Sequence, residues 1–124
     1  MPQVESQQII LNPPQLILVT GIGGSGKTTL CEELTRRIHA VHLCKDTIGK
    51  RFTEEYGLEH VVRFRKRTYE LLWQAIQDHV SNPDEKRSLL VDGSYRRQIQ
   101  APGWEQVFLE MATKFGFRFR IIRL

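Results

Sequence analysis

Short runs of apolar, often β-branched residues alternate along the chain with longer segments whose apolar residues recur every three or four positions. Runs of the first kind are typical of buried strands, and the second spacing is typical of amphipathic helices. Because the two alternate, the expected fold is α/β, with a mostly parallel sheet and helices on both of its faces. The predicted strands are residues 15–20, 40–44, 88–92 and 117–124. The predicted helices are residues 26–39, 47–56, 59–80 and 102–115.

Proline and glycine mark several boundaries between these elements. Residues 1–14 form a predicted N-terminal tail that ends at Pro13 and Pro14, since proline resists helix continuation. Gly116 is expected to stop the last helix before the fourth strand. Residues 15–124 then form one predicted domain, as the length of 124 residues suggests.

A glycine-rich segment separates the first predicted strand from the first predicted helix. Residues 21–28, Gly-Ile-Gly-Gly-Ser-Gly-Lys-Thr, fit the pattern G-x-x-x-x-G-K-[ST] of the phosphate-binding P-loop, or Walker A motif. Glycines let backbone N–H groups turn toward an anion, and the N-terminus of the helix adds its dipole. The alternative is a glycine-rich turn that merely begins a helix. The flanking strand and helix favour the P-loop, whose predicted nucleotide-binding residues are Gly21, Gly23, Gly24, Ser25, Gly26, Lys27, Thr28 and Thr29.

Two residues of this motif and two acidic residues are the candidates for chemistry. Lys27 is expected to reach the β- and γ-phosphates, and the hydroxyl of Thr28 to bind Mg²⁺. Asp92 ends the third strand, where a carboxylate suits Mg²⁺ or its water shell; a turn or cap role is the alternative. Asp46 follows the second strand and could accept a proton from an acceptor hydroxyl, or cap the next helix.

The composition is that of an ordinary globular protein, with 40% hydrophobic and 26% charged residues. No apolar run approaches the ~20 residues of a membrane span, and the N-terminus lacks the basic region of a secretory signal. These features predict a cytoplasmic protein without a membrane partner. Cys31 and Cys44 are interpreted as buried free thiols of a reducing compartment, not as metal ligands.

The net charge of +4 suits an anionic substrate and would also suit nucleic acid. The densest basic cluster, in residues 63–67, lies on a predicted helix and is interpreted as a solvated face. The guanine-reading sequence Asn-Lys-x-Asp does not occur, so adenine is preferred by elimination.

The segments 21–29, 44–48 and 90–97 together resemble a P-loop kinase group known as AAA-family ATPases or predicted kinases. That group is similar to the zeta toxins and the polynucleotide 5′-hydroxyl kinases, and the likeness covers about residues 15–124. It implies the three-layer P-loop NTPase fold, ATP and Mg²⁺ as cofactors, Asp46 as the general base and Asp92 in the acceptor site. Arg51 and Arg97 are further candidates for binding the substrate.

The chain departs from the family pattern at two places. Polynucleotide kinases have an arginine three positions after the base, where this chain has Gly49, so a small hydroxylated acceptor is favoured over nucleic acid. The family also continues past the fourth strand into an arginine-bearing lid and a fifth strand, whereas this sequence ends at Leu124. The resemblance therefore implies a domain truncated before that lid, slow phosphoryl transfer, and an open edge at the fourth strand that favours self-association.

The function predicted from these features is an ATP-dependent kinase. It would transfer the γ-phosphoryl group of ATP to a hydroxyl of a small molecule or nucleotide. The alternative is a non-catalytic module that binds a nucleotide or nucleic acid. The two hypotheses differ at Asp46, because only the kinase needs a carboxylate there.

Overall fold

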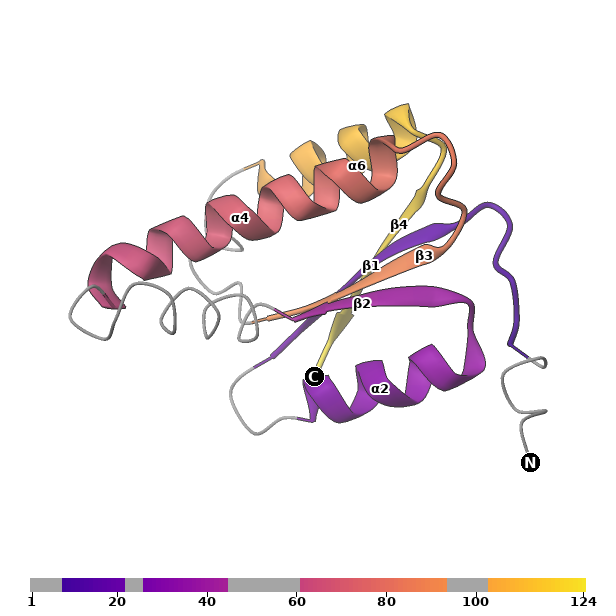
Figure 1. Ribbon diagram of the computed structural model, residues 1–124, viewed down its shortest axis with the longest axis horizontal. Helices are drawn as coiled ribbons and strands as arrows, with labels where there is room; N and C mark the ends of the chain where they lie inside the picture. Colours follow the sequence, from indigo (N-terminus) through magenta and orange to yellow (C-terminus); the bar gives the residue numbers. More distant parts are fainter. Residues whose placement is uncertain (1–7, 22–25, 45–60, 94–102) are drawn as a thin grey trace.

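The computed structural model describes residues 8–21, 26–44, 61–93 and 103–124, which form a sheet with helices on both faces (Figure 1). The first three strands begin and end at the predicted residues, because each is a short apolar run bounded by turn or loop residues. The predicted helix at 47–56 lies outside the described residues. In chain order the elements are β1 (Gln15–Thr20), α2 (Lys27–Arg37), β2 (Ala40–Cys44), α4 (Val61–Ser81), β3 (Ser88–Asp92), α6 (Trp104–Lys114) and β4 (Arg118–Arg123).

The strands form one parallel sheet in the order β2-β3-β1-β4. In β1, Leu18 pairs with Val91 of β3 on one side and with Ile121 of β4 on the other. β3 also pairs with β2, where Cys44 lies opposite Asp92. The carboxyl ends of the strands consequently meet at one edge of the sheet, which is where parallel α/β sheets bind their ligands.

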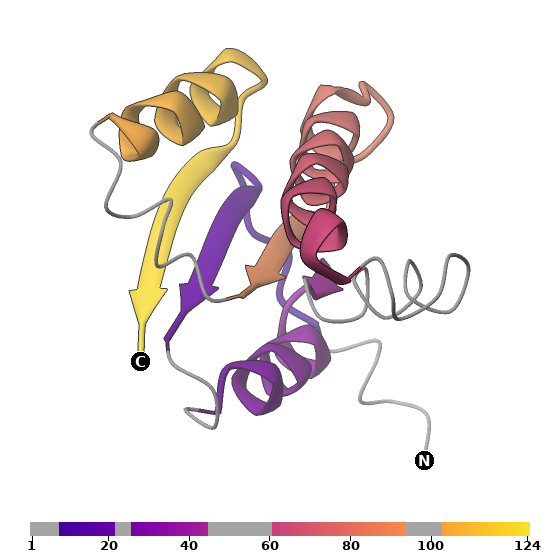
Figure 2. The same ribbon diagram turned by 90° about the vertical axis from the view of Figure 1, so that its left-hand side faces the viewer.

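Alternate side chains of the central strands serve two separate hydrophobic cores. α4 and α6 cover one face of the sheet and α2 covers the other, as the two views show (Figures 1 and 2). This is the predicted three-layer arrangement. The α4/α6 core includes Leu16, Leu18, Leu72, Ile76, Leu89, Val91, Phe108 and Ala112. The α2 core includes Ile17, Val19, Cys31, Ile38 and Leu90.

The end of α2 differs from the sequence prediction and ties the N-terminal segment to the domain. The helix ends at Arg37 rather than at residue 39, because Ile38 adopts an extended backbone with φ −122° and ψ 151°. Ile38 forms a parallel bridge with Ile9. The Ile9 N–H donates to the Arg37 carbonyl and the Ile9 carbonyl accepts from the His39 N–H, both at 2.8 Å. Residue 9 of the predicted N-terminal tail therefore packs on the edge of the domain.

Gly116 stops α6 as predicted, with a φ of 80° that favours glycine. The Phe117 N–H then donates to the Ala112 carbonyl at 2.8 Å, which satisfies one of the last carbonyl groups of the helix.

β4 follows at the outer position of the sheet, and it pairs on one side only among the residues that the structure describes. Its exposed arginines alternate with partly buried apolar side chains, a pattern that protects sheet edges. Self-association through this edge stays a prediction.

Candidate nucleotide-binding site

The P-loop motif lies where its chemistry requires, between the end of β1 and the beginning of α2. Gly26 directly precedes α2 and has a φ of 89°, in the left-handed region that L side chains rarely adopt. A Cβ at this position would meet no atom within 4 Å, so the backbone angle, and not the available space, explains the glycine. The described first turn of α2 carries no acidic residue, so its positive dipole end remains available to an anion.

Lys27 spans the two ends of the loop. Its Nζ donates a hydrogen bond of 2.9 Å to the carbonyl of Gly21, the residue that follows β1. Thr28 and Thr29 occupy the same first turn of α2 and are exposed. The lysine and the two threonines are thus grouped at the N-terminus of α2, the arrangement that the motif predicts.

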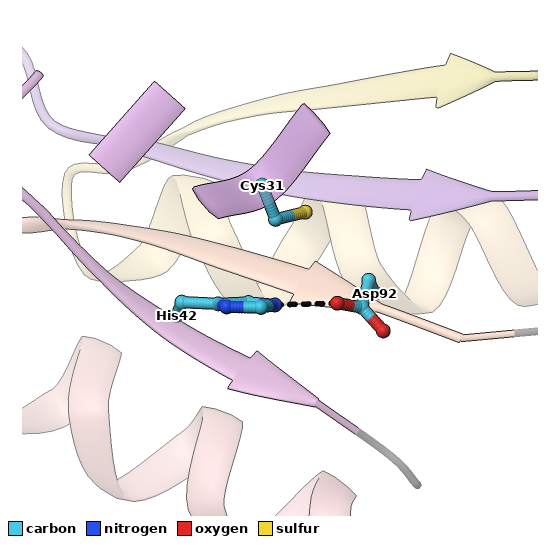
Figure 3. Close-up of side chains that lie close together, drawn as sticks. All are labelled: Cys31, His42 and Asp92. Carbon is cyan, nitrogen blue, oxygen red and sulfur yellow. Dashed lines mark hydrogen bonds and ion pairs between the residues drawn. The ribbon is translucent and has the colours of Figure 1, made fainter. Parts of the chain in front are cut away.

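Asp92 ends β3 in a buried position, with 1% of its surface exposed. The ring of His42, on the neighbouring strand β2, is hydrogen-bonded through Nε2 to Oδ2 of Asp92 (Figure 3). The thiol of Cys44 provides a second side-chain hydrogen bond to the same carboxylate. The Gly93 N–H donates to the Val19 carbonyl at 3.1 Å, so the backbone after Asp92 is tied to β1.

The partners of Asp92 keep it ionised despite its burial. Burial by itself would raise the pKa of the Asp92 carboxyl. The hydrogen bonds from His42 and Cys44, together with the charges of His42 and Lys27, lower this pKa by more than burial raises it. The net result is a pKa below the ordinary value. An ionised carboxylate accepts hydrogen bonds and donates none, so Nε2 of His42 carries the proton in this pair. The structure thus brings Lys27 and Asp92 close enough for their charges to interact.

Cys31 of α2 completes a cluster that the sequence analysis missed. The donor atoms of Cys31, His42 and Asp92 all lie within 4.8 Å of one another. Sulfur, imidazole nitrogen and carboxylate oxygen together form a donor set that suits zinc better than magnesium. Burial, the charge of Asp92 and the nearby Cys44 raise the pKa of the Cys31 thiol to about 12, so this thiol is protonated at neutral pH. In this state the three side chains form a polar group between α2 and the sheet, in which His42 and Asp92 are hydrogen-bonded to each other.

The sequence does carry a signal for part of this cluster. Side chains two residues apart on a strand lie on the same face, so His42 and Cys44 share a face of β2, and Asp92 lies on that face of β3. Both cysteines are free thiols, as predicted, but only Cys31 is buried, whereas Cys44 is partly exposed. What the sequence analysis lacked was the adjacency of β2 and β3.

Several predicted site residues lie outside the described residues, so the structure does not place them. They are Gly23, Gly24, Ser25, Asp46, Arg51 and Arg97. Two cavities of about 590 and 470 Å³ lie elsewhere, and neither is lined by the described P-loop residues or by Asp92. Within the described ranges, no helix combines the length and the apolar character that a membrane span needs.

Comparison with known proteins adds a family and a relative. A family model described as AAA domain (AAA_33) matches residues 16–124. Adenylate kinase from Rhodopirellula baltica (strain DSM 10527 / NCIMB 13988 / SH1) is 25% identical over 101 residues, which cover 79% of this chain and 53% of the relative. The chain therefore spans about half the length of this curated relative.

Two solved structures are similar to the chain. One comes from the PezAT chromosomal toxin–antitoxin system of the human pathogen Streptococcus pneumoniae, with a TM-score of 0.54 and 19% identity. That match covers 98% of this chain and 52% of the other, and it supports the α/β fold of P-loop NTPases. The other comes from the Pnkp1/Rnl/Hen1 complex, with a TM-score of 0.49, 18% identity, and coverage of 90% and 36%.

Proposed function

Because the chain belongs to the AAA domain family, within the P-loop kinase group, we propose that it transfers the γ-phosphoryl group of ATP to a hydroxyl group. The acceptor would be a small molecule or a nucleotide, and residues 15–124 would form the catalytic domain. One observation carries the proposal: Lys27, at the N-terminus of α2 and bonded to the Gly21 carbonyl, lies at the same edge of the sheet as the buried carboxylate of Asp92 at the end of β3. A cation and an ionised carboxylate at the carboxyl edge of a parallel sheet suit a nucleotide bound with a divalent cation.

The residues present fit Mg²⁺ and the phosphates of ATP. The carboxylate of Asp92 is ionised, and the hydroxyl of Thr28 lies on the exposed first turn of α2. Thr28 and Asp92, the latter directly or through water, would hold Mg²⁺, which when bound neutralises charge on the β- and γ-phosphates. Lys27 would exchange its hydrogen bond to Gly21 for one to a phosphate oxygen.

The transfer step needs a base as well as the phosphate site. The oxygen of the acceptor hydroxyl would form a bond to the γ-phosphorus, while the bond from that phosphorus to the β–γ bridging oxygen breaks and ADP leaves. The hydroxyl proton would pass to Asp46, the candidate base, which lies outside the described residues. Arg51 and Arg97, also outside them, remain candidates for binding the acceptor.

The comparisons support a nucleotide as one class of acceptor. The relative from Rhodopirellula baltica is an adenylate kinase, whose name specifies a nucleotide acceptor, although adenylate receives the phosphoryl group on a phosphate oxygen and not on a hydroxyl. The net charge of +4 also suits a phosphorylated acceptor. A screen of nucleoside monophosphates and hydroxylated small molecules with labelled ATP and Mg²⁺ would distinguish the acceptors.

Binding of ATP is tested by Lys27→Ala. Removing a charge-assisted hydrogen bond worth about 1.5–3 kcal/mol should weaken ATP binding by about ten- to a hundredfold, as measured by calorimetry with Mg²⁺. Lys86→Ala is the matched control, because Lys86 is an exposed lysine in the turn before β3, at the opposite end of that strand from Asp92. Unchanged ATP affinity in a folded Lys27→Ala protein would refute the nucleotide site.

The kinase and the non-catalytic module are separated by Asp46→Asn. This change preserves the shape of the side chain and removes its capacity to accept a proton. Loss of general-base assistance should slow phosphoryl transfer by about 10²- to 10⁴-fold, with little change in ATP affinity. If the main effect is instead a lower melting temperature, Asp46 acts as a helix cap and the catalytic role is rejected.

A further inference from the structure

We propose that His42 is a positioning residue that holds the Asp92 carboxylate in the orientation in which it serves the divalent cation. This inference rests on the proposed function, because it assumes that Asp92 faces Mg²⁺ or its water shell. It assigns a role to a residue of β2 that lies outside the P-loop and outside every motif of the sequence. His42 would act through Asp92 and would not touch the nucleotide.

The geometry restricts which oxygen of Asp92 is available to a ligand. Nε2 of His42 donates to Oδ2, and Figure 3 shows the second carboxylate oxygen directed away from the ring. The carboxylate belongs to the last residue of β3. The next residue, Gly93, is hydrogen-bonded to the end of β1 through the Val19 carbonyl. Occupation of Oδ2 by the imidazole therefore leaves the other oxygen for a cation or its water.

Burial explains why a positioning partner is needed. Asp92 is 1% exposed, and an ionised carboxylate removed from water is costly unless it is hydrogen-bonded. The side chain of His42 is 19% exposed and comes from the strand next to β3, so its ring is held by the sheet. The aspartate side chain is short, and its hydrogen bond to an imidazole ring fixed on a strand leaves the carboxylate little freedom to rotate. Such orientation is the usual contribution of a hydrogen-bonded partner behind a metal ligand.

The other neighbours of the carboxylate do not supply the same constraint. The Cys44 thiol is a weaker hydrogen-bond donor than an imidazole N–H. The Cys31 sulfur lies within 4.8 Å of the donor atoms of His42 and Asp92, and its thiol is likewise a weak donor. Lys27 acts through its charge, which attracts the carboxylate without fixing its rotation. The orientation of Asp92 therefore depends mainly on His42.

The test compares two substitutions of similar length at one position. His42→Gln keeps an N–H donor near the place of Nε2, whereas His42→Met fills the space without a donor. ATP binding would be measured by calorimetry over a series of Mg²⁺ concentrations and in EDTA, together with the melting temperature. We expect His42→Met to raise the half-saturating Mg²⁺ concentration by about 10- to 100-fold and His42→Gln to stay near the wild type. Affinity for ATP in EDTA should not change in either variant, since the P-loop is intact.

Two further variants separate this inference from the proposed function. Asp92→Asn should raise the Mg²⁺ requirement at least as much as His42→Met. His79→Ala is the matched control, because His79 is also hydrogen-bonded through Nε2, to the Arg87 carbonyl at 2.8 Å, and lies at the end of α4 before β3. It should leave the Mg²⁺ requirement unchanged.

Each outcome decides one of the two claims. If Asp92→Asn leaves the Mg²⁺ requirement unchanged, the proposed role of Asp92 fails and the inference fails with it. If Asp92→Asn raises it and His42→Met does not, the inference alone is overturned. If the Gln and Met variants raise the requirement equally, an N–H donor at this position is not what holds Asp92, and the positioning role is rejected.

Discussion

The α4/α6 side of the sheet and the α2 side differ in what they bury. On the first side, large apolar side chains such as Leu18, Leu72 and Ile76 pack against one another in the interior. On the second side, Ile17 and Val19 share the interior with the polar cluster, which consists of Cys31, His42 and Asp92. The same central strands supply both faces, because their side chains alternate.

Under the proposed function, this difference separates stability from nucleotide binding along one set of strands. Burying a Leu or Ile side chain contributes about 1.5–3 kcal/mol to the free energy of unfolding. The apolar side chains of the α4/α6 face therefore stabilise the fold without needing hydrogen-bonding partners. A buried carboxylate is tolerated only with hydrogen-bonding partners, and Asp92 has them in His42 and Cys44. The polar cluster lies on the side of α2, the helix that follows the P-loop. Substitutions on the two faces should therefore have different consequences.

The largest loss of stability is expected from Ile76→Ala on the α4/α6 side. Ile76 is 1% exposed, and truncating such a residue typically costs about 2–5 kcal/mol through lost contacts and a cavity. Urea unfolding should show this loss, while calorimetry on the remaining folded protein should show unchanged ATP affinity. Gln74→Ala on the exposed side of the same helix should cost less than about 0.5 kcal/mol. A drop in ATP affinity for Ile76→Ala would contradict the separation of the two faces.

The next effect concerns the α2 side at alkaline pH. The pKa of Cys31 is raised to about 12 in the folded protein, above about 8.5 for a free thiol. The stability that Cys31 contributes is therefore fully present below about pH 8.5 and is lost as the pH rises toward the folded-state pKa, by at most about 1.4 kcal/mol per pH unit. Cys31→Ala should flatten the decline in unfolding free energy between pH 8.5 and 10. Equal slopes in the two proteins would show that the thiol is not shielded as the structure indicates.

A pair of glycine substitutions compares the loop end with a remote turn. Gly26 and Gly116 have φ angles of 89° and 80°, and a Cβ would meet nothing within 4 Å at either position. Each change to alanine should therefore cost about 1–2 kcal/mol from backbone strain alone. Only Gly26→Ala should also weaken ATP binding, because only Gly26 belongs to the P-loop. Equal ATP affinity in the two variants would show that Gly26 does not contribute to the nucleotide site.

The smallest effect is expected at the outer strand β4. Arg123 forms an ion pair of 2.9 Å with Glu105 of α6, and more than half of each side chain is exposed. Arg123→Ala should therefore change the unfolding free energy by less than about 1 kcal/mol, and less still at high salt. Thermal melts at low and high salt would measure this. A larger loss would show that β4 depends on its contact with α6 more than the exposed pair indicates.

Local patterns in the sequence predicted most of the secondary structure. The runs at 15–20, 40–44 and 88–92 became β1, β2 and β3 at the predicted residues, since an apolar run bounded by turn residues depends only on neighbours in the chain. The end of α2 was less predictable, because Ile38 leaves the helix to pair with Ile9, about thirty residues away. The P-loop was readable because all its residues are consecutive.

The polar cluster was decided by tertiary structure. Cys31, His42 and Asp92 come from α2, β2 and β3, and of the three only Asp92 was marked as a site residue by its place at the end of a predicted strand. The period of a strand assigns His42 and Asp92 to faces, but only the strand order places β2 beside β3. Strand order depends on pairing between distant segments, which no local pattern encodes. The sequence by itself therefore determined the fold class and the phosphate-binding loop, and tertiary pairing determined which side chains surround the carboxylate beside it.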